Sequence, residues 1–298
     1  KNVQGKSFLD QSVLLPENGK IGMINDAAWV DLNGKGNKSL VLAGEWMDIT
    51  ILNFNGKEFV KKTIPETTGW WKTINFIDID EDGDMDLLGG NLGLNTKLKA
   101  SKQEPINLYL QDFDRNGKLD AIMTMGSKSN ESIFTTKSIL ESQIPSLRKK
   151  FSTAKAYAEA SLKEMLGDNL TKATKLTAVE MRSGIFINDN DAFQFKPFPN
   201  IMQISFIRNF LIDDYDGDGK KEIFAVGNLY PSSIQEGSYS ADRGTILNTN
   251  LHSYFQTSLP IDPPLKGDFR HLELMIFKGD KLIMMSSNNA PIKWLRVK

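Results

Sequence analysis

The sequence predicts an all-β fold built from repeats of one short unit. An acidic loop that contains glycine recurs three times along the 298 residues, and each copy lies between two apolar runs of strand length. The chain also contains no cysteine, which excludes disulfides and thiolate metal sites. A repeated strand–loop–strand unit of this kind indicates a sheet-rich repeat architecture.

The clearest loop spans residues 78–86 and carries carboxylates at its positions 1, 3, 5 and 9. Gly83 at position 6 permits a sharp turn, because a residue without Cβ adopts positive φ at no steric cost. Short side chains on alternate residues converge on one point, where Ca²⁺ takes about six to eight oxygen ligands. The loop is similar to the front of an EF-hand, but Gly89 replaces the Glu needed at position 12, and the flanks read as strands.

The same ligand positions recur at residues 112–120, with Asn116 at position 5, and at residues 214–222, with Glu222 at position 9. Position 7 of each loop would offer its backbone carbonyl. The sequence therefore predicts three calcium sites. Their expected ligands are Asp78, Asp80, Asp82, Asp84, Asp86, Asp112, Asp114, Asn116, Lys118, Asp120, Asp214, Asp216, Asp218, Lys220 and Glu222.

A worn copy at residues 31–39 keeps the turn but has one carboxylate. Lys35 occupies position 5, so we expect its ammonium group to replace the ion and this loop to bind no metal. The loops at 78–86 and 214–222 keep four carboxylates each among these positions and are expected to bind more tightly than the loop at 112–120. A structural role is favoured over a catalytic one, because about five ligands from one loop leave room mainly for water.

Several segments resemble a known family, the FG-GAP/VCBS repeat. The segments that carry the resemblance are the loops with their flanking strands and the phrases Asp26-Ala-Ala-Trp-Val-Asp31, Ala43-Gly44-Glu45-Trp46 and Gly90-Asn91-Leu92-Gly93-Leu94-Asn95. These phrases look like the VCBS-repeat proteins of Bacteroidetes-type bacteria, some of which carry an ASPIC/UnbV domain that we do not see here. The resemblance implies a β-propeller with Ca²⁺ in the loops between the first two strands of each blade. It implies less about function, because propellers host both binding and catalysis.

The first strands of the repeats number five, which predicts a five-bladed β-propeller in one domain over residues 1–298. These strands are expected at residues 24–30, 72–77, 106–110, 204–212 and 270–277. Residues 1–22 are expected to supply an outer strand to the last blade. The alternative is a fragment of a larger ring.

A helical insertion at about residues 136–167 interrupts the repeats. Ser138 and Glu141 have the spacing of a capping box, Pro145 divides the segment, and Gly167 is a plausible stop. Apolar residues then recur every three or four positions, which favours a stripe that packs on the parent domain over a partner surface.

Composition bears on location and partners. The net charge of −1 and the lack of a basic stripe argue against nucleic acid as a partner. Calcium loops of weak affinity suit a calcium-rich compartment, so we expect an extracytoplasmic protein that is periplasmic, attached to the outer membrane or secreted. Because the sequence begins with Lys1 rather than Met, we expect a removed address segment and surface attachment through a segment outside this sequence.

Polar and aromatic residues follow the second strands of several repeats and would form a ring at one end of the central channel if the repeats superpose. Such a ring could stack on sugars or hold a carboxylate. The alternative is structural, with Asn capping turns and aromatic rings filling gaps between blades. The candidate ligand-binding residues are Glu45, Trp46, Trp70, Trp71, Asn91, Asn228, Tyr230, Arg243 and Asn288.

Catalytic chemistry is hard to find in the sequence. Only two histidines exist, His252 and His271, and no nucleophile elbow, Walker loop or dinucleotide fingerprint is present. The preferred function is therefore a non-catalytic, calcium-stabilised binding or scaffold module that engages a glycan or a protein. The alternative is a polysaccharide-active enzyme, a lyase or glycosidase that uses the channel face. Its unassigned carboxylates would be Glu45, Asp48, Glu180, Glu236 and Asp242.

Overall fold

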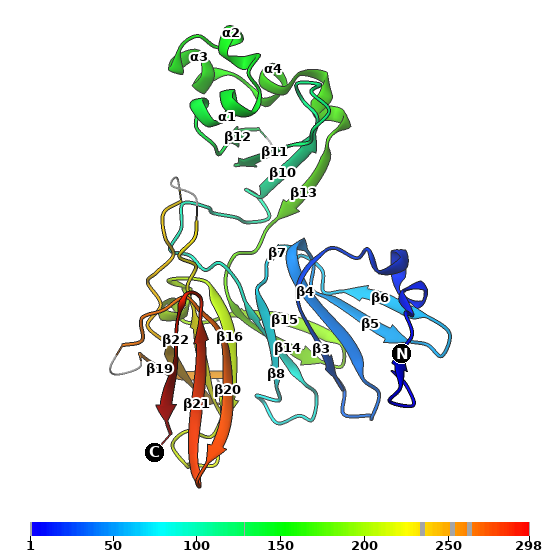
Figure 1. Ribbon diagram of the computed structural model, residues 1–298, viewed down its shortest axis with the longest axis vertical. Coiled ribbons are helices and arrows are strands. Elements are labelled where there is room, and N and C mark those ends of the chain that lie inside the picture. Colours follow the sequence, from blue (N-terminus) through cyan, green and yellow to red (C-terminus); the bar gives the residue numbers. More distant parts are fainter. Residues whose placement is uncertain (1, 128, 233–235, 251–253, 261–263, 298) are drawn as a thin grey trace. The chain divides into compact units, whose positions relative to one another are not determined.

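The computed structural model describes residues 2–127, 129–232, 236–250, 254–260 and 264–297, with the backbone alone at 256–260. The described chain divides into two compact units, and the expectation of a single domain stays a prediction (Figure 1). Unit 1 contains Lys1–Thr96 and Met181–Lys298, and unit 2 contains Lys97–Glu180. Among the described residues, no helix has the length and apolar character that a membrane span requires.

The first sheet of unit 1 is formed by consecutive antiparallel strands, and the short β7 pairs with the far end of β4. The connection between β3 and β4 is the worn loop. The strands are β3 (Met23–Val30), β4 (Ser39–Met47), β5 (Thr50–Phe54), β6 (Phe59–Thr63) and β7 (Gly69–Trp70).

The second sheet is built from two segments that lie far apart in the sequence. Its strands follow the order β15-β14-β9-β8, so the hairpin β14–β15 completes the sheet that β8 and β9 begin. Unit 2 lies in the chain between the two halves. The strands are β8 (Thr73–Ile77), β9 (Asp86–Gly90), β14 (Gly184–Asp189) and β15 (Ala192–Pro197).

The hairpin β14–β15 is therefore the outer hairpin of the second repeat, and its residues come after unit 2. The segment between the two halves of this sheet includes all of Lys97–Glu180, which is longer than the helical insertion expected at about residues 136–167.

The third sheet has four strands and the fourth has three. Strands β9 and β17 are buried along their whole length, which fits the absence of polar side chains after their first residues, Asp86 and Glu222. The third sheet consists of β16 (Ile207–Asp213), β17 (Glu222–Gly227), β18 (Thr245–Asn250) and β19 (Tyr254–Pro260), and the short 3-10 helix η4 (Asn200–Gln203) precedes it. The fourth sheet consists of β20 (Phe269–Phe277), β21 (Asp280–Ser287) and β22 (Ala290–Arg296).

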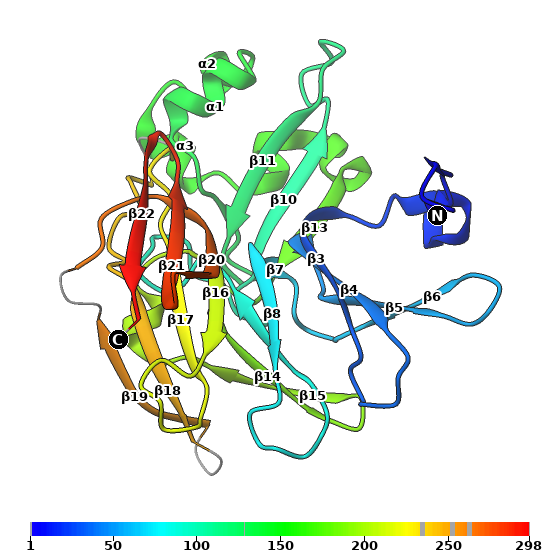
Figure 2. The same cartoon turned by 60° about the horizontal axis from the view of Figure 1, so that its bottom comes forward.

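The first strands of the four sheets are neighbours in series. Strand β3 contacts β8, β8 contacts β16, and β16 contacts β20 (Figure 2). A separate apolar core fills the space between each pair of neighbouring sheets. Representative buried residues are Val41 and Trp71 in the first core, Leu88 and Ile223 in the second, and Phe224 and Phe269 in the third.

Unit 2 contains the remaining four-stranded sheet, in the order β12-β11-β10-β13. The predicted first strand at 106–110 is therefore present as β10, but it lies in unit 2, and unit 1 holds the other four. The strands are β10 (Ile106–Gln111), β11 (Asp120–Met125), β12 (Ser132–Ile133) and β13 (Thr174–Ala178).

Short helices fill the chain between β12 and β13 in unit 2. Their apolar residues, such as Leu140, Leu147 and Phe151, pack with Ile122 of β11. The helix N-terminus predicted at Ser138 is wrong: α1 begins after Thr136, and the capping box is formed by Ser161 and Glu164 of α4. The helices are α1 (Lys137–Gln143), α2 (Leu147–Lys150), α3 (Ala154–Glu159), α4 (Leu162–Leu166) and the 3-10 helix η3 (Gly167–Lys172).

The N-terminal segment does not extend the last sheet. Strands β1 (Asn2–Val3) and β2 (Ser7–Phe8) pair only with each other, and two 3-10 helices follow, η1 (Ser12–Leu14) and η2 (Pro16–Gly19). The expectation of an outer strand for the last blade is therefore wrong within the described residues. The apolar runs that suggested it are largely exposed, as in Phe8 and Val13.

Candidate metal loops and the neighbouring polar cluster

All four acidic loops adopt one backbone conformation, including the worn copy. Positions 4 and 6 of each loop lie in the left-handed region, where glycine is favoured. Position 6 is glycine in every copy, whereas position 4 is glycine in only two. The pairs at positions 4 and 6 are Gly34 and Gly36, Glu81 and Gly83, Arg115 and Gly117, and Gly217 and Gly219.

In the loop between β8 and β9, the carboxylates at positions 1 and 9 organise the backbone. Asp78 accepts hydrogen bonds from the backbone N–H groups of Asp82 and Gly83, at 3.2 and 3.1 Å. Asp86 is fully buried and accepts from the N–H of Ile79 at 2.9 Å. The loop therefore places its first and last carboxylates on the inner side of the turn.

The other two complete loops repeat these bonds. Between β10 and β11, Asp112 accepts from the N–H of Gly117 at 2.8 Å, and Asp120 accepts from that of Phe113 at 2.9 Å. Between β16 and β17, Glu222 accepts from the N–H of Tyr215 at 2.8 Å. Position 9 thus binds the N–H of position 2 in all three complete loops, whether it is Asp or Glu.

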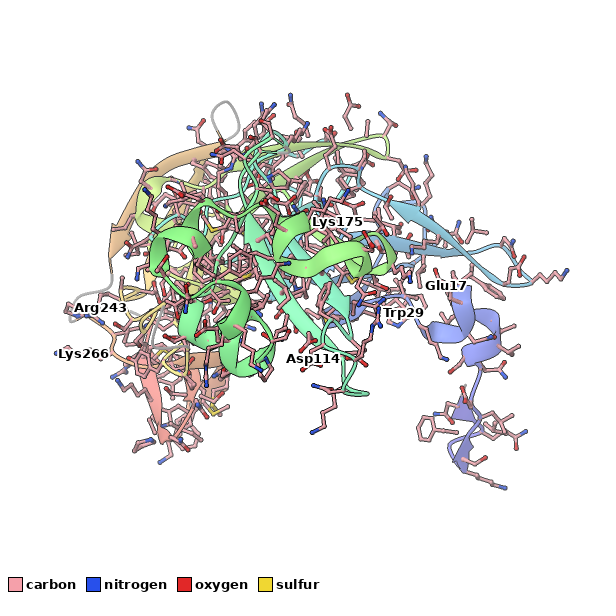
Figure 3. All side chains as sticks on the ribbon, turned by 90° about the horizontal axis from the view of Figure 1, so that it is seen from above. Glu17, Trp29, Asp114, Lys175, Arg243 and Lys266 are labelled. Carbon is pink, nitrogen blue, oxygen red and sulfur yellow. The ribbon has the colours of Figure 1, made fainter. Side chains whose placement is uncertain are left out.

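The structure brings predicted ligands together in each complete loop. Within each group, one ligand atom per residue lies within 4.8 Å of the others. Asp114, in unit 2, is labelled in Figure 3. The groups are Asp78 with Asp80 and Asp86, Asp112 with Asp114 and Asp120, and Asp214 with Asp216 and Asp218.

Other predicted ligands make contacts within or beside the loops. The side chains of Asp82, Asn116 and Asp218 at position 5 accept from the N–H of position 7 in their loops. The carboxylate of Asp84 accepts from the N–H of Asn190, so it contacts the β14–β15 turn that the sequence did not place nearby. Lys118 and Lys220, expected to act through their carbonyls, have exposed side chains.

The electrostatics of the first complete loop fit a cation. Burial raises the pKa of Asp86 to about 6, and burial together with the neighbouring Asp82 and Asp78 raises the pKa of Asp80. One carboxylate oxygen of Asp80, Oδ1, is buried and has no hydrogen-bond partner within the described residues. A divalent cation among these oxygens would convert their mutual repulsion into attraction.

The loops at 112–120 and 214–222 show the same tendency at position 9. Burial raises the pKa of Asp120 and of Glu222, and the acidic groups of the same loop add to both shifts. Oxygen donors alone form these sites, which suits Ca²⁺ or Mg²⁺ better than a softer metal.

In the worn loop, Asp31 keeps the position 1 contact and accepts from the N–H of Gly36 at 2.6 Å. Ser39 at position 9 bonds to Asn53 instead of a loop N–H. Lys35 is exposed and forms no ion pair within the described residues, so the geometry does not support replacement of an ion by its ammonium group. The absence of a metal ion from this loop stays a prediction.

Three of the ring candidates have structural roles. Asn91 is fully buried and accepts from the N–H groups of Trp70 and Leu92. Asn228 is fully buried and donates to the carbonyls of Asp242 and Gly267. Trp71 lies in the first core, and its indole N–H donates to the carbonyl of Thr67 at 2.6 Å.

The glycines that precede Glu45 and Asn228 allow close backbone approach. A Cβ on Gly227 would lie 1.6 Å from the carbonyl oxygen of Phe206, and one on Gly44 would lie 2.1 Å from that of Met23. The ends of the second strands therefore pack tightly on the chain that leads into the first strands.

The remaining ring candidates are more accessible. Tyr230 and Asn288 are exposed, and the half-buried Arg243, labelled in Figure 3, donates to the carbonyl of Ser240 at 3.1 Å. Trp46 contacts Trp70 edge to face, with ring centroids 5.3 Å apart.

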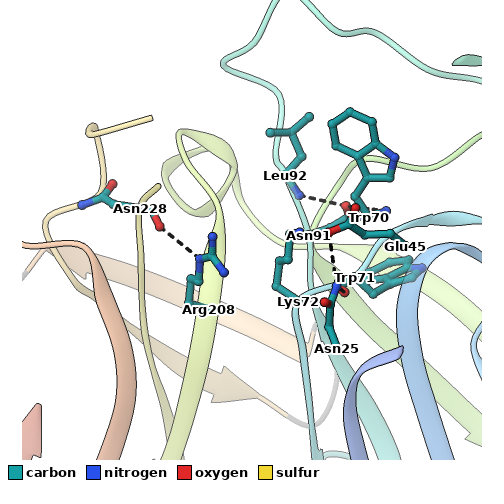
Figure 4. A network of polar contacts seen from close by, with 9 residues as sticks. All are labelled: Asn25, Glu45, Trp70, Trp71, Lys72, Asn91, Leu92, Arg208 and Asn228. Atoms are coloured by element: carbon teal, nitrogen blue, oxygen red, sulfur yellow. Dashed lines mark hydrogen bonds and ion pairs between the residues drawn. The ribbon is translucent and has the colours of Figure 1, made fainter. Parts of the chain in front are cut away.

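Glu45 forms an ion pair with Lys72, a residue absent from the candidates (Figure 4). Arg208, also in Figure 4, approaches the same region from β16, and its Nε donates to the carbonyl of Asn228 at 3.2 Å. Arg270 of β20 pairs with Asp268 at 2.8 Å. The sequence missed these cations because each is an isolated basic residue in or beside an apolar strand, and no local motif marks it.

Comparison with known families agrees with the repeated loops. Residues 31–89 match the family model described as FG-GAP-like repeat, so the chain contains an FG-GAP repeat. The match runs from the worn loop to the strand that follows the first complete loop. No curated protein matches the chain.

Proposed function

We propose that this FG-GAP repeat protein is a calcium-stabilised, non-catalytic binding or scaffold module that engages a glycan or a protein outside the cytoplasm. The observation that carries the proposal is the recurrence of one loop geometry with converging carboxylates at three strand connections. Three copies of an acidic cluster with the same hydrogen bonds are hard to explain without a common ligand, since the like charges repel one another.

Calcium is the proposed ion at all three loops. The available donors are carboxylates, an amide oxygen and backbone carbonyls, which are hard ligands on a flexible turn. Asp78, Asp80 and Asp86 would hold the ion in the first complete loop, and the corresponding residues would hold it in the other two. Such an ion stabilises the folded state by mass action, because the unfolded chain does not gather these ligands.

We further propose that the sheets are propeller blades. Four lie in unit 1 with their first strands in series, and the sheet of unit 2 contains the fifth predicted first strand, at residues 106–110. In this arrangement the loops join the first and second strands of their blades.

Binding is favoured over catalysis by the contacts of the carboxylates outside the loops. Glu45 is paired with Lys72, and Asp48 accepts from the N–H of Thr67 at 2.9 Å. Asp242 is buried and accepts from the N–H groups of Gly227 and Gly244. A glycosidase needs two carboxyl groups that face one sugar, and these three have structural partners instead. His252 lies outside the described residues.

Thermal unfolding in Ca²⁺ and in excess EGTA tests the proposal, together with a glycan array probed with the Ca²⁺ form. We expect the melting temperature to fall by more than about 5 °C in EGTA, since loss of several kcal/mol of linkage energy shifts it by at least that much. An unchanged melting temperature would mean that the loops do not hold the fold through a metal.

A further inference from the structure

Three of the four first strands of unit 1, β3, β16 and β20, share an irregularity near their N-terminal ends. The pairing register shifts between Ile24 and Asp26 in β3, between Ile207 and Asn209 in β16, and between Phe269 and His271 in β20. The extra residue is therefore Asn25, Arg208 or Arg270 in the respective strand. A bulge redirects the side chain of its extra residue, and it is often found beside functional sites.

The second sheet places a cation at the corresponding level without a bulge. Lys72 precedes β8, and its backbone N–H donates to the carbonyl of Gly90 at 2.8 Å, one residue beyond the pairing of Thr73 with Gly90. Three successive first strands therefore bring Lys72, Arg208 and Arg270 to one end of unit 1.

These cations lie close enough to interact with one another. The Nζ of Lys72 lies 5.4 Å from the centroid of the Phe206 ring, and the Cζ of Arg208 lies 5.6 Å from the same centroid. Burial lowers the pKa of both groups, and the positive charge of Arg270 lowers both further. We call Lys72, Arg208 and Arg270, with Glu45 and Asp268, the cationic cluster.

The cationic cluster has an excess of positive charge. Lys72 pairs with Glu45 and Arg270 pairs with Asp268, but Arg208 forms no ion pair within the described part of the chain. Its one hydrogen bond there is made by Nε, so both Nη groups keep their donors. The nearby carboxylates of Asp268 and Glu45 offset only part of the charge of Arg208. A half-buried guanidinium without a direct ion pair is costly, and an anion that accepts from its two Nη groups would reduce that cost.

Aromatic side chains adjoin the Glu45–Lys72 pair. Glu45 pairs with Trp70 across β4 and β7, and the indole N–H of Trp70 is buried without a partner among the described residues. Trp46 has a φ of 59°, which is unusual and strained for a bulky residue. Half-buried aromatic rings beside an excess cation suit a sugar ring that carries an anionic group.

We propose that the cationic cluster binds the carboxylate of an acidic saccharide, with Arg208 as its bidentate partner and Lys72 as a second positive charge. This inference rests on the proposed binding function and names the class of ligand. Glu45 competes for Lys72 in the free protein, so it limits the affinity for anions. Arginine suits this role because its planar donors match the geometry of a carboxylate.

Isothermal titration of the calcium-loaded protein with trigalacturonate tests the inference, with neutral galactotriose, a sulfated galactotriose and triglutamate as comparison probes. We expect trigalacturonate to bind, Arg208→Gln to weaken binding at least about tenfold, and Lys57→Gln, an exposed control in unit 1, to leave it unchanged. Glu45→Gln should tighten binding severalfold because it frees Lys72. The melting temperature of each variant shows whether it is folded.

The outcomes separate the inference from the proposed function. Binding of galactotriose as tight as that of trigalacturonate, or equal affinity for the wild type and a folded Arg208→Gln variant, overturns the inference and leaves a glycan-binding module. Preference for triglutamate would identify an acidic peptide instead, and preference for the sulfated probe would show recognition of sulfate. If none of the four probes binds and a glycan array is also negative, both the inference and glycan binding fail.

Discussion

At the scale of the residue, Asp86 combines two roles. It is a candidate metal ligand, and its two carboxylate oxygens accept from the N–H groups of Ile79 and Asn188, at 2.9 and 2.8 Å. The second bond joins the loop to β14, which follows the insertion. One side chain therefore ties together the two halves of the second sheet.

We predict that Asp86→Ala lowers the free energy of unfolding in Ca²⁺ by about 3 kcal/mol or more. The substitution leaves two N–H groups near the buried site without acceptors, each costing roughly 1–3 kcal/mol. Asp82→Ala in the same loop is the matched control, because the Asp82 side chain is exposed and, within the described part of the chain, accepts only from a loop N–H. Urea denaturation of both variants measures the difference. Equal losses for the two would contradict this role of Asp86.

Asp242 predicts a pH dependence that is independent of the metal loops. Burial raises its pKa to about 6, although the N–H groups of Gly227 and Gly244 oppose the shift. The folded state therefore keeps this proton up to higher pH than the unfolded state, whose carboxyl has a pKa of about 3.9. The contribution of Asp242 to stability is present below about pH 4 and is lost as the pH rises to about 6.

Between about pH 4 and about pH 6, the contribution of Asp242 to the free energy of unfolding should fall by roughly 3 kcal/mol. Asp242→Asn should be less stable at low pH, because the N–H groups of Gly227 and Gly244 bond to different oxygens of Asp242 and the new NH₂ group would face one of them. The variant should also lack this part of the pH dependence. Urea denaturation of both proteins at several pH values in EGTA isolates the difference. Parallel curves for the two proteins would show that Asp242 titrates normally.

The residue scale also shows where sequence reasoning succeeds. The grouping of the loop carboxylates was predictable, because side chains on alternate residues of a tight loop converge on one point. Lys72, Arg208 and Arg270 were not, because they meet through strand order and bulges that no local pattern records. Asn91 and Asn228 were predicted as either ligand residues or caps, and their burial favours the caps.

At the scale of the element, the loop backbone is the conserved feature of the four copies within this chain. Glu81 and Arg115 occupy position 4 with φ near 60°, where the other two copies have glycine. A left-handed residue with a Cβ costs about 1 kcal/mol. The loop geometry is therefore imposed by its side-chain bonds at these positions rather than by glycine alone.

We predict opposite effects from a reciprocal pair of substitutions at position 4. Gly217→Ala should lower the free energy of unfolding by about 1 kcal/mol, and a new Cβ there would meet no atom within 4 Å, so backbone strain alone is responsible. Glu81→Gly should be neutral or stabilising by up to about 1 kcal/mol, since it removes that strain. Calorimetry in Ca²⁺ measures both. A stabilising Gly217→Ala would refute the shared conformation.

Element boundaries were predictable where the signal is local. The three complete loops, their flanking strands and the end of α4 at Gly167 follow from short patterns. The partner of β9 was not predictable, because the hairpin that completes the sheet comes after the whole of unit 2. The isolated capping signal at Ser138 failed because α1 begins earlier and a second capping box, at Ser161, is the one that forms.

At the scale of the whole molecule, unit 2 is inserted between two segments of unit 1 that lie side by side. The N–H of Gly93 donates to the carbonyl of Met181 at 2.7 Å, so the chain leaves and re-enters unit 1 at neighbouring points. Among the described residues, none of unit 2 belongs to the first sheet, the second sheet or the cores beside them.

We predict that unit 1 folds when Lys97–Glu180 is replaced by a short glycine–serine linker, because the linker has little distance to span. The product should keep a cooperative unfolding transition and bind two calcium ions where the full chain binds three. Circular dichroism and calcium titration test this. Aggregation or a non-cooperative transition would show that unit 1 depends on unit 2.

The central claim is that the three complete loops hold calcium. The most direct measurement is anomalous diffraction from crystals of the full chain grown with Ca²⁺. The account predicts one anomalous peak among Asp78, Asp80 and Asp86, one peak in each of the loops at 112–120 and 214–222, and none at Asp31. Three loops without a peak, or a peak at Asp31 stronger than the others, would contradict it.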